Sequence, residues 1–232
     1  MKKLLVLLFS LFLLSSPSVF ADDISDFQIE GISIGDSLLD YMTEEEILEG
    51  IELYEGYSYL NEPYKYIQII ISRNFQTYEY LSVFIKNNSI SQYLTNKNEK
   101  FTILSVRGAI SYEEDFDGCI QKRNEITKVL SEKFPNAKKT EEFFKHVGDP
   151  SGESIVDGVY FDLKSGAQSE VSCFDFEETF RNKENWTEGL QVSIDLEEIF
   201  KQIFKKNNTG KIIRDLTSEV SMFITNGVSP VI

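Results

Sequence analysis

The chain has 232 residues, of which 38 are acidic and 23 basic, and its net charge at pH 7 is −15. A surface this acidic repels phosphate backbones and anionic lipid headgroups, so we expect no nucleic-acid and no membrane-surface partner. The partners that remain are an unidentified protein or small molecule.

The first 21 residues have the pattern of a secretory signal peptide. Lys2 and Lys3 form the basic start, an apolar stretch covers 4–14, and Ala21 ends a small-x-small cleavage sequence. The apolar stretch is too short for a membrane span, and the segment has no cysteine for the lipoprotein route. We therefore predict cleavage after Ala21 and a periplasmic or secreted mature chain without a membrane span.

Residues 27–34 predict a short strand, and the following Gly35-Asp36-Ser37-Leu38 matches the nucleophile block of the GDSL hydrolases. Enzymes of that family also need a C-terminal Asp-x-x-His base and a G-x-N-D block. The chain has no G-x-N-D, and its one histidine, His146, has Phe143 at the required Asp position. A serine without a base is a weak nucleophile. We therefore reject this resemblance and expect Ser37 to be a turn or N-cap residue.

A capping box, Thr43 with Glu46, predicts a short helix that runs through Leu48. After it, β-branched and aromatic runs predict an antiparallel meander of three strands, over residues 66–72, 78–86 and 101–110.

The next segment is an acidic loop that partly matches an EF-hand. Glu113, Asp115 and Asp117 fall on ligand positions one, three and five, but Asn124 stands where the closing carboxylate belongs. These three residues are weak calcium candidates, so we expect no bound metal and no other cofactor. The calcium-stabilised module stays an alternative.

Helical spacing returns over 118–134, where one apolar stripe predicts a buried face. The stripe contains Cys119, Ile126, Val129, Leu130 and Phe134, and the outward positions are Lys122, Arg123, Glu125, Lys128 and Glu132. Cys119 and Cys173 are the two cysteines, and they lack the C-x-x-C spacing of redox or metal pairs. In an exported protein we expect one structural disulfide, worth about 4 kcal/mol for a loop of roughly 50 residues.

Residues 155–163 and 169–176 predict a hairpin that turns at 164–166. The strand predicted over 190–196 alternates perfectly, so we expect Gln191, Ser193 and Asp195 to face water. His146 is expected to be a structural or surface residue, and Trp186 an anchor against the core.

Asp195 is expected to cap a helix that reaches Phe204, with Lys205 and Lys206 in its last turn. The tail could form one more amphipathic helix, with Ile212, Leu216, Val220 and Phe223 on its apolar face.

These elements indicate an α+β fold, an antiparallel sheet with helices packed on one face in two layers. We expect a signal peptide (1–21), one domain (22–206) and a tail (207–232). The domain could consist of two similar halves, 22–111 and 112–206.

Several stretches resemble small, uncharacterised secreted proteins of AT-rich marine bacteria. They are the opening "DFQIEGISIGDSLLDYMTEEEI", the central "TILSVRGAI", the "C-x-x-K-R-N-E-I" helix and the "YFDLKSG" hairpin. The resemblance covers about 27–196, implies export and a disulfide, and transfers no catalytic residue.

The sequence favours an exported, non-enzymatic protein that binds a partner or small ligand, with no catalytic residue assigned. The alternative of another class is a small envelope hydrolase that uses Ser37.

Overall fold

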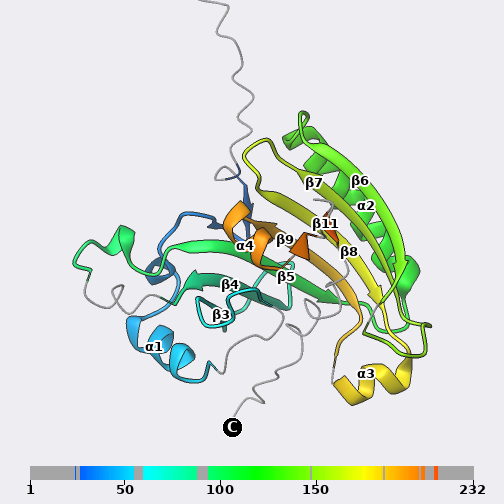
Figure 1. Cartoon of the computed structure of the whole chain (residues 1–232), viewed down its shortest axis with the longest axis horizontal. Coiled ribbons are helices and arrows are strands. Elements are labelled where there is room, and N and C mark those ends of the chain that lie inside the picture. Colours follow the sequence, from blue (N-terminus) through cyan, green and yellow to red (C-terminus); the bar gives the residue numbers. More distant parts are fainter. Residues whose placement is uncertain are drawn as a thin grey trace, which may run out of the picture.

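A twisted antiparallel sheet of seven strands forms the centre of the molecule (Figure 1). The computed structural model describes residues 24, 27–54, 60–87, 94–146, 148–184, 186–203, 205–206 and 212–213. In spatial order the strands are β3 (Tyr66–Ile71), β4 (Tyr80–Lys86), β5 (Ile103–Ser111), β9 (Gly189–Asp195), β8 (Gln168–Asp175), β7 (Ile155–Asp162) and β6 (Lys138–Lys145). The predicted α+β class and the three-strand meander are confirmed.

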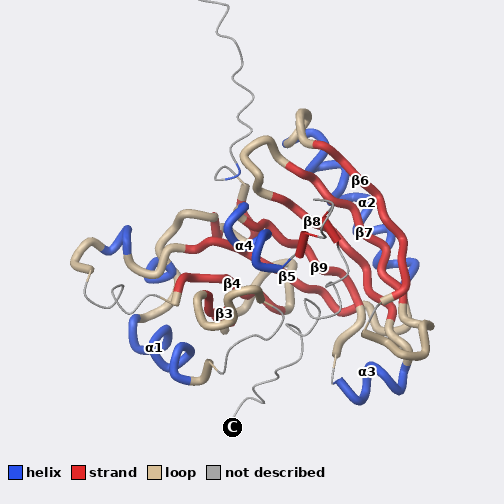
Figure 2. Tube along the Cα trace, in the orientation of Figure 1, coloured by secondary structure: helices blue, strands red, loops and turns tan. Residues whose placement is uncertain are grey.

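The two longer helices cover one face of this sheet. α1 (Glu44–Glu52) packs on β3, and α2 (Phe116–Lys133) packs on β8 and β9. The short helices α3 (Glu178–Glu184) and α4 (Glu197–Ile203) follow β8 and β9, and Figure 2 shows α4 in front of the sheet with α2 behind it. β5 pairs with β9, so strands of both predicted halves join in one sheet.

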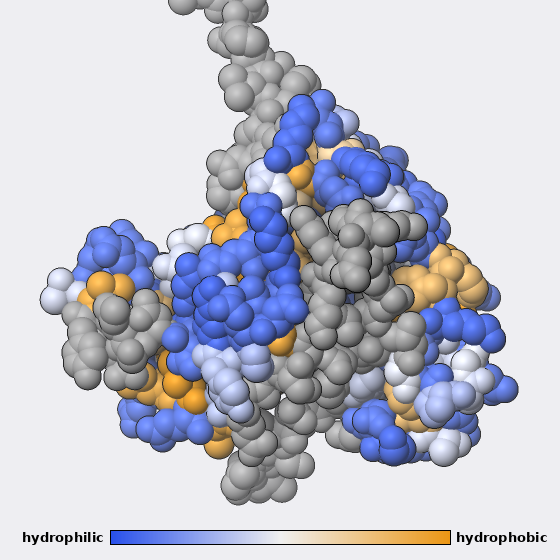
Figure 3. All heavy atoms as spheres, viewed as in Figure 1, coloured by the Kyte–Doolittle hydropathy of each residue, from blue (hydrophilic) through white to orange (hydrophobic). Residues whose placement is uncertain are grey.

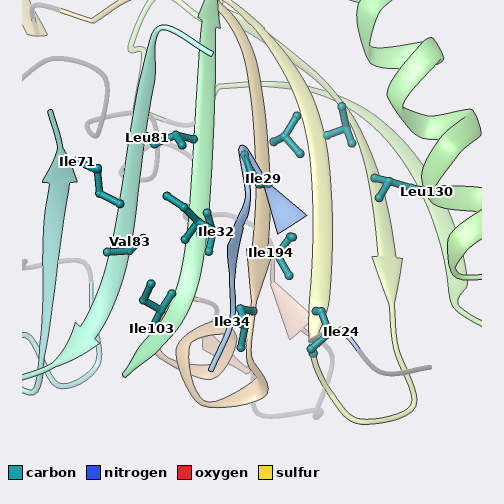
Figure 4. Packing of buried hydrophobic residues seen from close by; sticks show 14 of the residues in the cluster. Ile24, Ile29, Ile32, Ile34, Ile71, Leu81, Val83, Ile103, Leu130 and Ile194 are labelled. Atoms are coloured by element: carbon teal, nitrogen blue, oxygen red, sulfur yellow. The ribbon is translucent and has the colours of Figure 1, made fainter. Parts of the chain in front are cut away.

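The main core lies between the sheet and the face that α1 and α2 cover. A small hairpin, β1 (Gln28–Ile29) and β2 (Ile32–Ser33), contacts β5 and adds Ile29 and Ile32 to this core. Figure 4 shows Ile29 and Ile32 between Val83 and Ile194. The sequence predicts one strand here, but Glu30 and Gly31 adopt φ angles of 53° and 80° and turn the chain back.

A disulfide joins Cys119 of α2 to Cys173 of β8, as predicted, and both residues are fully buried. Two predictions for α2 are wrong. Val129 is 59% exposed instead of buried. Arg123 is buried instead of outward, because its guanidinium forms an ion pair with Asp157 of β7.

The edge strand β6 and the helix α3 were not predicted from the sequence. β6 reads KKTEEFFK and carries charges at most positions, because its outer edge has no neighbouring strand within the described part of the chain. The apolar alternation that reveals a half-buried strand is therefore missing.

The end of the chain differs from the prediction at three points. α4 begins at Glu197 and ends at Ile203, and Asp195 is the last residue of β9, so Asp195 is not its cap. Lys205–Lys206 form β10, which pairs with β11 (Ile212–Ile213). Ile212 is thus in a strand, and the rest of the predicted tail helix lies outside the described residues, as does the predicted signal peptide with Ala21.

Candidate functional site

Ser37 occupies a structural position. Its hydroxyl donates to the carbonyl of Lys100 (2.8 Å) and accepts from the amide of Leu39 (3.3 Å). It is the N-cap of a 3-10 helix, Leu38–Asp40, and is 2% exposed. The predicted N-cap role is confirmed, and a serine held in this way has no base within its recorded hydrogen bonds.

The acidic loop leads directly into α2 and supplies its N-cap. Asp115 is the N-cap of α2, and its carboxylate accepts from the amide of Gly118 (2.9 Å). Within the described ranges, no group of three or more His, Cys, Asp or Glu side chains is placed to hold a metal ion. Glu113, Asp115 and Asp117 therefore do not form such a group.

His146 and Trp186 belong to a small apolar cluster beside β7 and β8. The His146 ring lies 5.3 Å from the rings of Phe176 and Trp186 and 5.6 Å from that of Phe180, centre to centre. His146 is 1% exposed and Trp186 7%. The structural role expected for both is confirmed.

An open hollow of about 550 Å³ lies beside the 3-10 helix Leu38–Asp40. Its charged groups are already paired in the wall. Lys97 Nζ lies 2.6 Å from Asp40 Oδ1, and Glu46 accepts from the amide and hydroxyl of Thr43 (both 2.7 Å). These charged groups therefore have partners within the protein and do not indicate a ligand-binding site in the hollow.

The opposite face of the sheet from α1 and α2 carries the strongest candidate. Strand register brings together polar side chains from five neighbouring strands, which we call the polar floor. Its members are Ser82 of β4, Ser105 and Arg107 of β5, Gln191, Ser193 and Asp195 of β9, Gln168, Glu170 and Ser172 of β8, and Tyr160 of β7.

Every member of the polar floor is at most 7% exposed. The expectation that the polar side of β9 faces water is therefore wrong. The alternation of 190–196 is correct, but its polar side lies on the floor, where Gln191 is 2%, Ser193 0% and Asp195 4% exposed.

An ion pair stands at the centre of the polar floor. Asp195 Oδ1 accepts from Arg107 Nη2 (2.9 Å) and from the hydroxyl of Ser105 (2.6 Å), and Oδ2 accepts from the hydroxyl of Ser193 (2.8 Å). The guanidinium carbon of Arg107 also lies 5.4 Å from the ring centre of Phe84. Because a buried charge is costly without partners, these bonds explain how two ions persist on one sheet face.

Two hydroxyl groups lie over Gly158 of β7, one from Ser172 of β8 and one from Tyr160 of β7 itself. A Cβ atom added at Gly158 would lie 2.6 Å from Ser172 Oγ and 2.6 Å from the hydroxyl of Tyr160. Ser172 also donates to Glu170 Oε1 (2.6 Å). The missing side chain of Gly158 thus leaves space for a group of polar atoms on β7 and β8.

Gln191 lies in register with Ser172, beside this group. Its side-chain nitrogen is buried and has no hydrogen-bond partner among the described residues. Leaving such a donor unpaired costs about 1–3 kcal/mol. An unpaired amide within an otherwise hydrogen-bonded surface therefore indicates a place for an acceptor from outside the protein.

Apolar clusters flank the polar floor at two corners. At one, Ile199 and Phe200 of α4 pack on Tyr66, Phe84 and Leu104. At the other, the His146 cluster packs on Phe174 and Val156. Figure 3 shows mainly hydrophilic atoms on the described surface of this side.

The polar floor was not predicted from the sequence, because no single strand has a pattern that indicates it. Arg107 was a usable signal, since an arginine in the middle of the β-branched run TILSVRGAI needs a buried partner. Its pairing with Asp195 depends on β5 lying beside β9, across 88 residues of sequence.

Comparison with protein families, with curated proteins and with solved structures finds no match in any of the three. No described helix has the length and apolar composition needed to cross a bilayer.

Proposed function

We propose that this chain is an exported, non-enzymatic binding protein whose ligand lies on the polar floor. The observation that carries the proposal is the unpaired, buried side-chain amide of Gln191 among hydroxyl, carboxylate and guanidinium groups. Binding sites commonly combine apolar walls with a few convergent polar groups, and the two flanking clusters supply such walls.

Export is supported by the first 21 residues and by the buried disulfide, which is typical of oxidising compartments. Mass measurement of protein from its own envelope should give a chain that begins at Asp22 and has no free thiol. A chain that retains Met1, or two free thiols, would contradict export.

A hydrolase at Ser37 is disfavoured by the contacts of that residue. Its hydroxyl is committed to the backbone of Lys100 and Leu39, and the one histidine of the chain is enclosed by aromatic rings in a separate cluster. A nucleophilic serine needs a base within hydrogen-bond reach.

A thermal-melt screen of the mature, oxidised protein tests binding without assuming the ligand. The panel contains neutral sugars, amino acids, phosphate, lipids and calcium and magnesium salts. A ligand at 100 times its dissociation constant adds about 2.7 kcal/mol, which raises the melting temperature of a domain near 200 residues by several degrees.

The matched variants are Gln191→Met on the floor and Gln28→Met on β1, where Gln28 is exposed. We expect a shift that Gln191→Met reduces and Gln28→Met preserves. A shift that both variants preserve would place the ligand elsewhere, and a panel without any shift would contradict a small-ligand function.

A further inference from the structure

We infer that the polar floor binds a neutral, hydroxyl-rich small molecule, a sugar or related polyol. This inference rests on the proposed function, because it names the ligand class of that same site. It follows from the charges and the hydrogen-bonding groups of the floor.

The charges of the floor disfavour anions. Arg107, its one cationic side chain, is already bonded to Asp195, while Glu170 adds a second carboxylate. The whole chain carries a net charge of −15. A phosphate or carboxylate ligand would therefore meet excess negative charge, which is costly at a buried site.

The orphan donor disfavours a metal ion or a simple ammonium. Gln191 Nε2 presents N–H groups without an acceptor, and a cation placed there would face the positive end of the amide dipole. An apolar ligand would leave the same donor unpaired. What the site needs is an acceptor.

A hydroxyl group meets both requirements of the floor, since it accepts and donates. It can accept from Gln191 while it donates to an acceptor beside it, such as the carboxylate of Glu170. Thr140 of β6 adds another such position. Its buried hydroxyl oxygen has no partner among the described residues, and it lies in register with Tyr160.

A glycan array followed by titration calorimetry tests this class. The mature, oxidised protein is applied to neutral, amino and uronic glycans, and the best neutral sugar is then titrated beside its amino and uronic counterparts, glycine and inorganic phosphate. We expect the neutral sugar to bind most tightly. Gln191→Met should raise its dissociation constant about five- to tenfold, the value of one hydrogen bond, and Gln28→Met should not change it.

Gln191→Met also separates a binding role from a structural one. Because it removes an unpaired buried amide, we expect the variant without ligand to melt at the same or a higher temperature than the parent. A variant that melts lower shows that Gln191 serves the fold and overturns the inference.

The remaining outcomes distinguish a failure of the sugar class from a failure of the proposed binding function. Preferential binding of an amine, a uronic acid, glycine or phosphate that Gln191→Met weakens would overturn the sugar class and leave the floor as a binding site. If no compound of the array or titration series binds in a way that depends on Gln191, both fail.

Discussion

The proposed binding function depends on single residues of the polar floor. Arg107 and Asp195 form a buried ion pair whose side chains are 4% and 5% exposed. Such a pair is weak evidence for stability, since replacing both members by apolar residues is often neutral. Breaking it is different, because one charge then stays buried without its partner.

We expect Asp195→Ala to lower the free energy of unfolding by about 3–5 kcal/mol, measured by urea denaturation. The double variant Arg107→Met, Asp195→Leu should recover most of that loss. The pair is not an isolated unit if Asp195→Ala costs under about 1 kcal/mol. The same holds if the double variant costs as much as Arg107→Met and Asp195→Leu, each made alone, cost together.

The free energy of unfolding should depend on pH through the carboxylate of Asp149. Burial alone would raise its pKa, but hydrogen bonds from the hydroxyls and amides of Ser151 and Ser154 hold the pKa well below the ordinary value of 3.8. The carboxylate therefore stabilises the fold above pH 3.8, and this contribution is lost as the pH falls below it.

The free energy of unfolding of the parent should exceed that of Asp149→Asn by a constant amount above about pH 5, and the difference should shrink from pH 4 downward. Urea melts between pH 7 and pH 3 measure it, with Glu153→Gln, an exposed neighbour, as the control. An equal difference at pH 3 and pH 7 would show that the hydrogen bonds do not favour the ionised carboxylate.

At the scale of elements, prediction from sequence succeeded where the signal is local. The start of α1 is an example. Thr43 and Glu46 exchange backbone and side-chain hydrogen bonds as the capping box requires. Prediction failed where neighbouring strands determine the structure. The charged edge strand β6 is one case. Asp195 is another, because it precedes α4 in the sequence but its carboxylate accepts a hydrogen bond from Ser105 of β5.

Thr43→Ala should lower the free energy of unfolding by about 1 kcal/mol, because it removes the acceptor for the amide of Glu46 and one donor to its carboxylate. Thr43→Ser keeps both groups and should cost far less. Equal losses for the two variants, measured by thermal and urea unfolding, would mean that the hydroxyl does not cap α1.

For the molecule as a whole, the fold class and the disulfide could be predicted, but the candidate site could not. Period-two patterns predicted the strands, and the expectation of export predicted a bridge between the two cysteines. The polar floor arises only when β5 and β9 become neighbours, after two meanders meet. No local pattern states which strands pair across such a distance.

The bridge between Cys119 and Cys173 closes a separation of 54 residues. Cys119→Ala combined with Cys173→Ala should therefore lower the free energy of unfolding by about 4 kcal/mol. Denaturation of the reduced parent is the matched control and should agree with the double variant. A loss below about 1 kcal/mol in both would show that the bridge hardly constrains the unfolded chain.

If the ligand contacts the side chain of Gln191, the nitrogen-15 NMR signal of that side-chain amide must respond to binding. Gln191→Met assigns the signal by removing it. During titration with the tightest-binding neutral sugar of the array, we expect this signal to shift and to saturate at the dissociation constant found by calorimetry. A signal that stays in place while the sugar saturates the protein would show that the ligand does not contact Gln191.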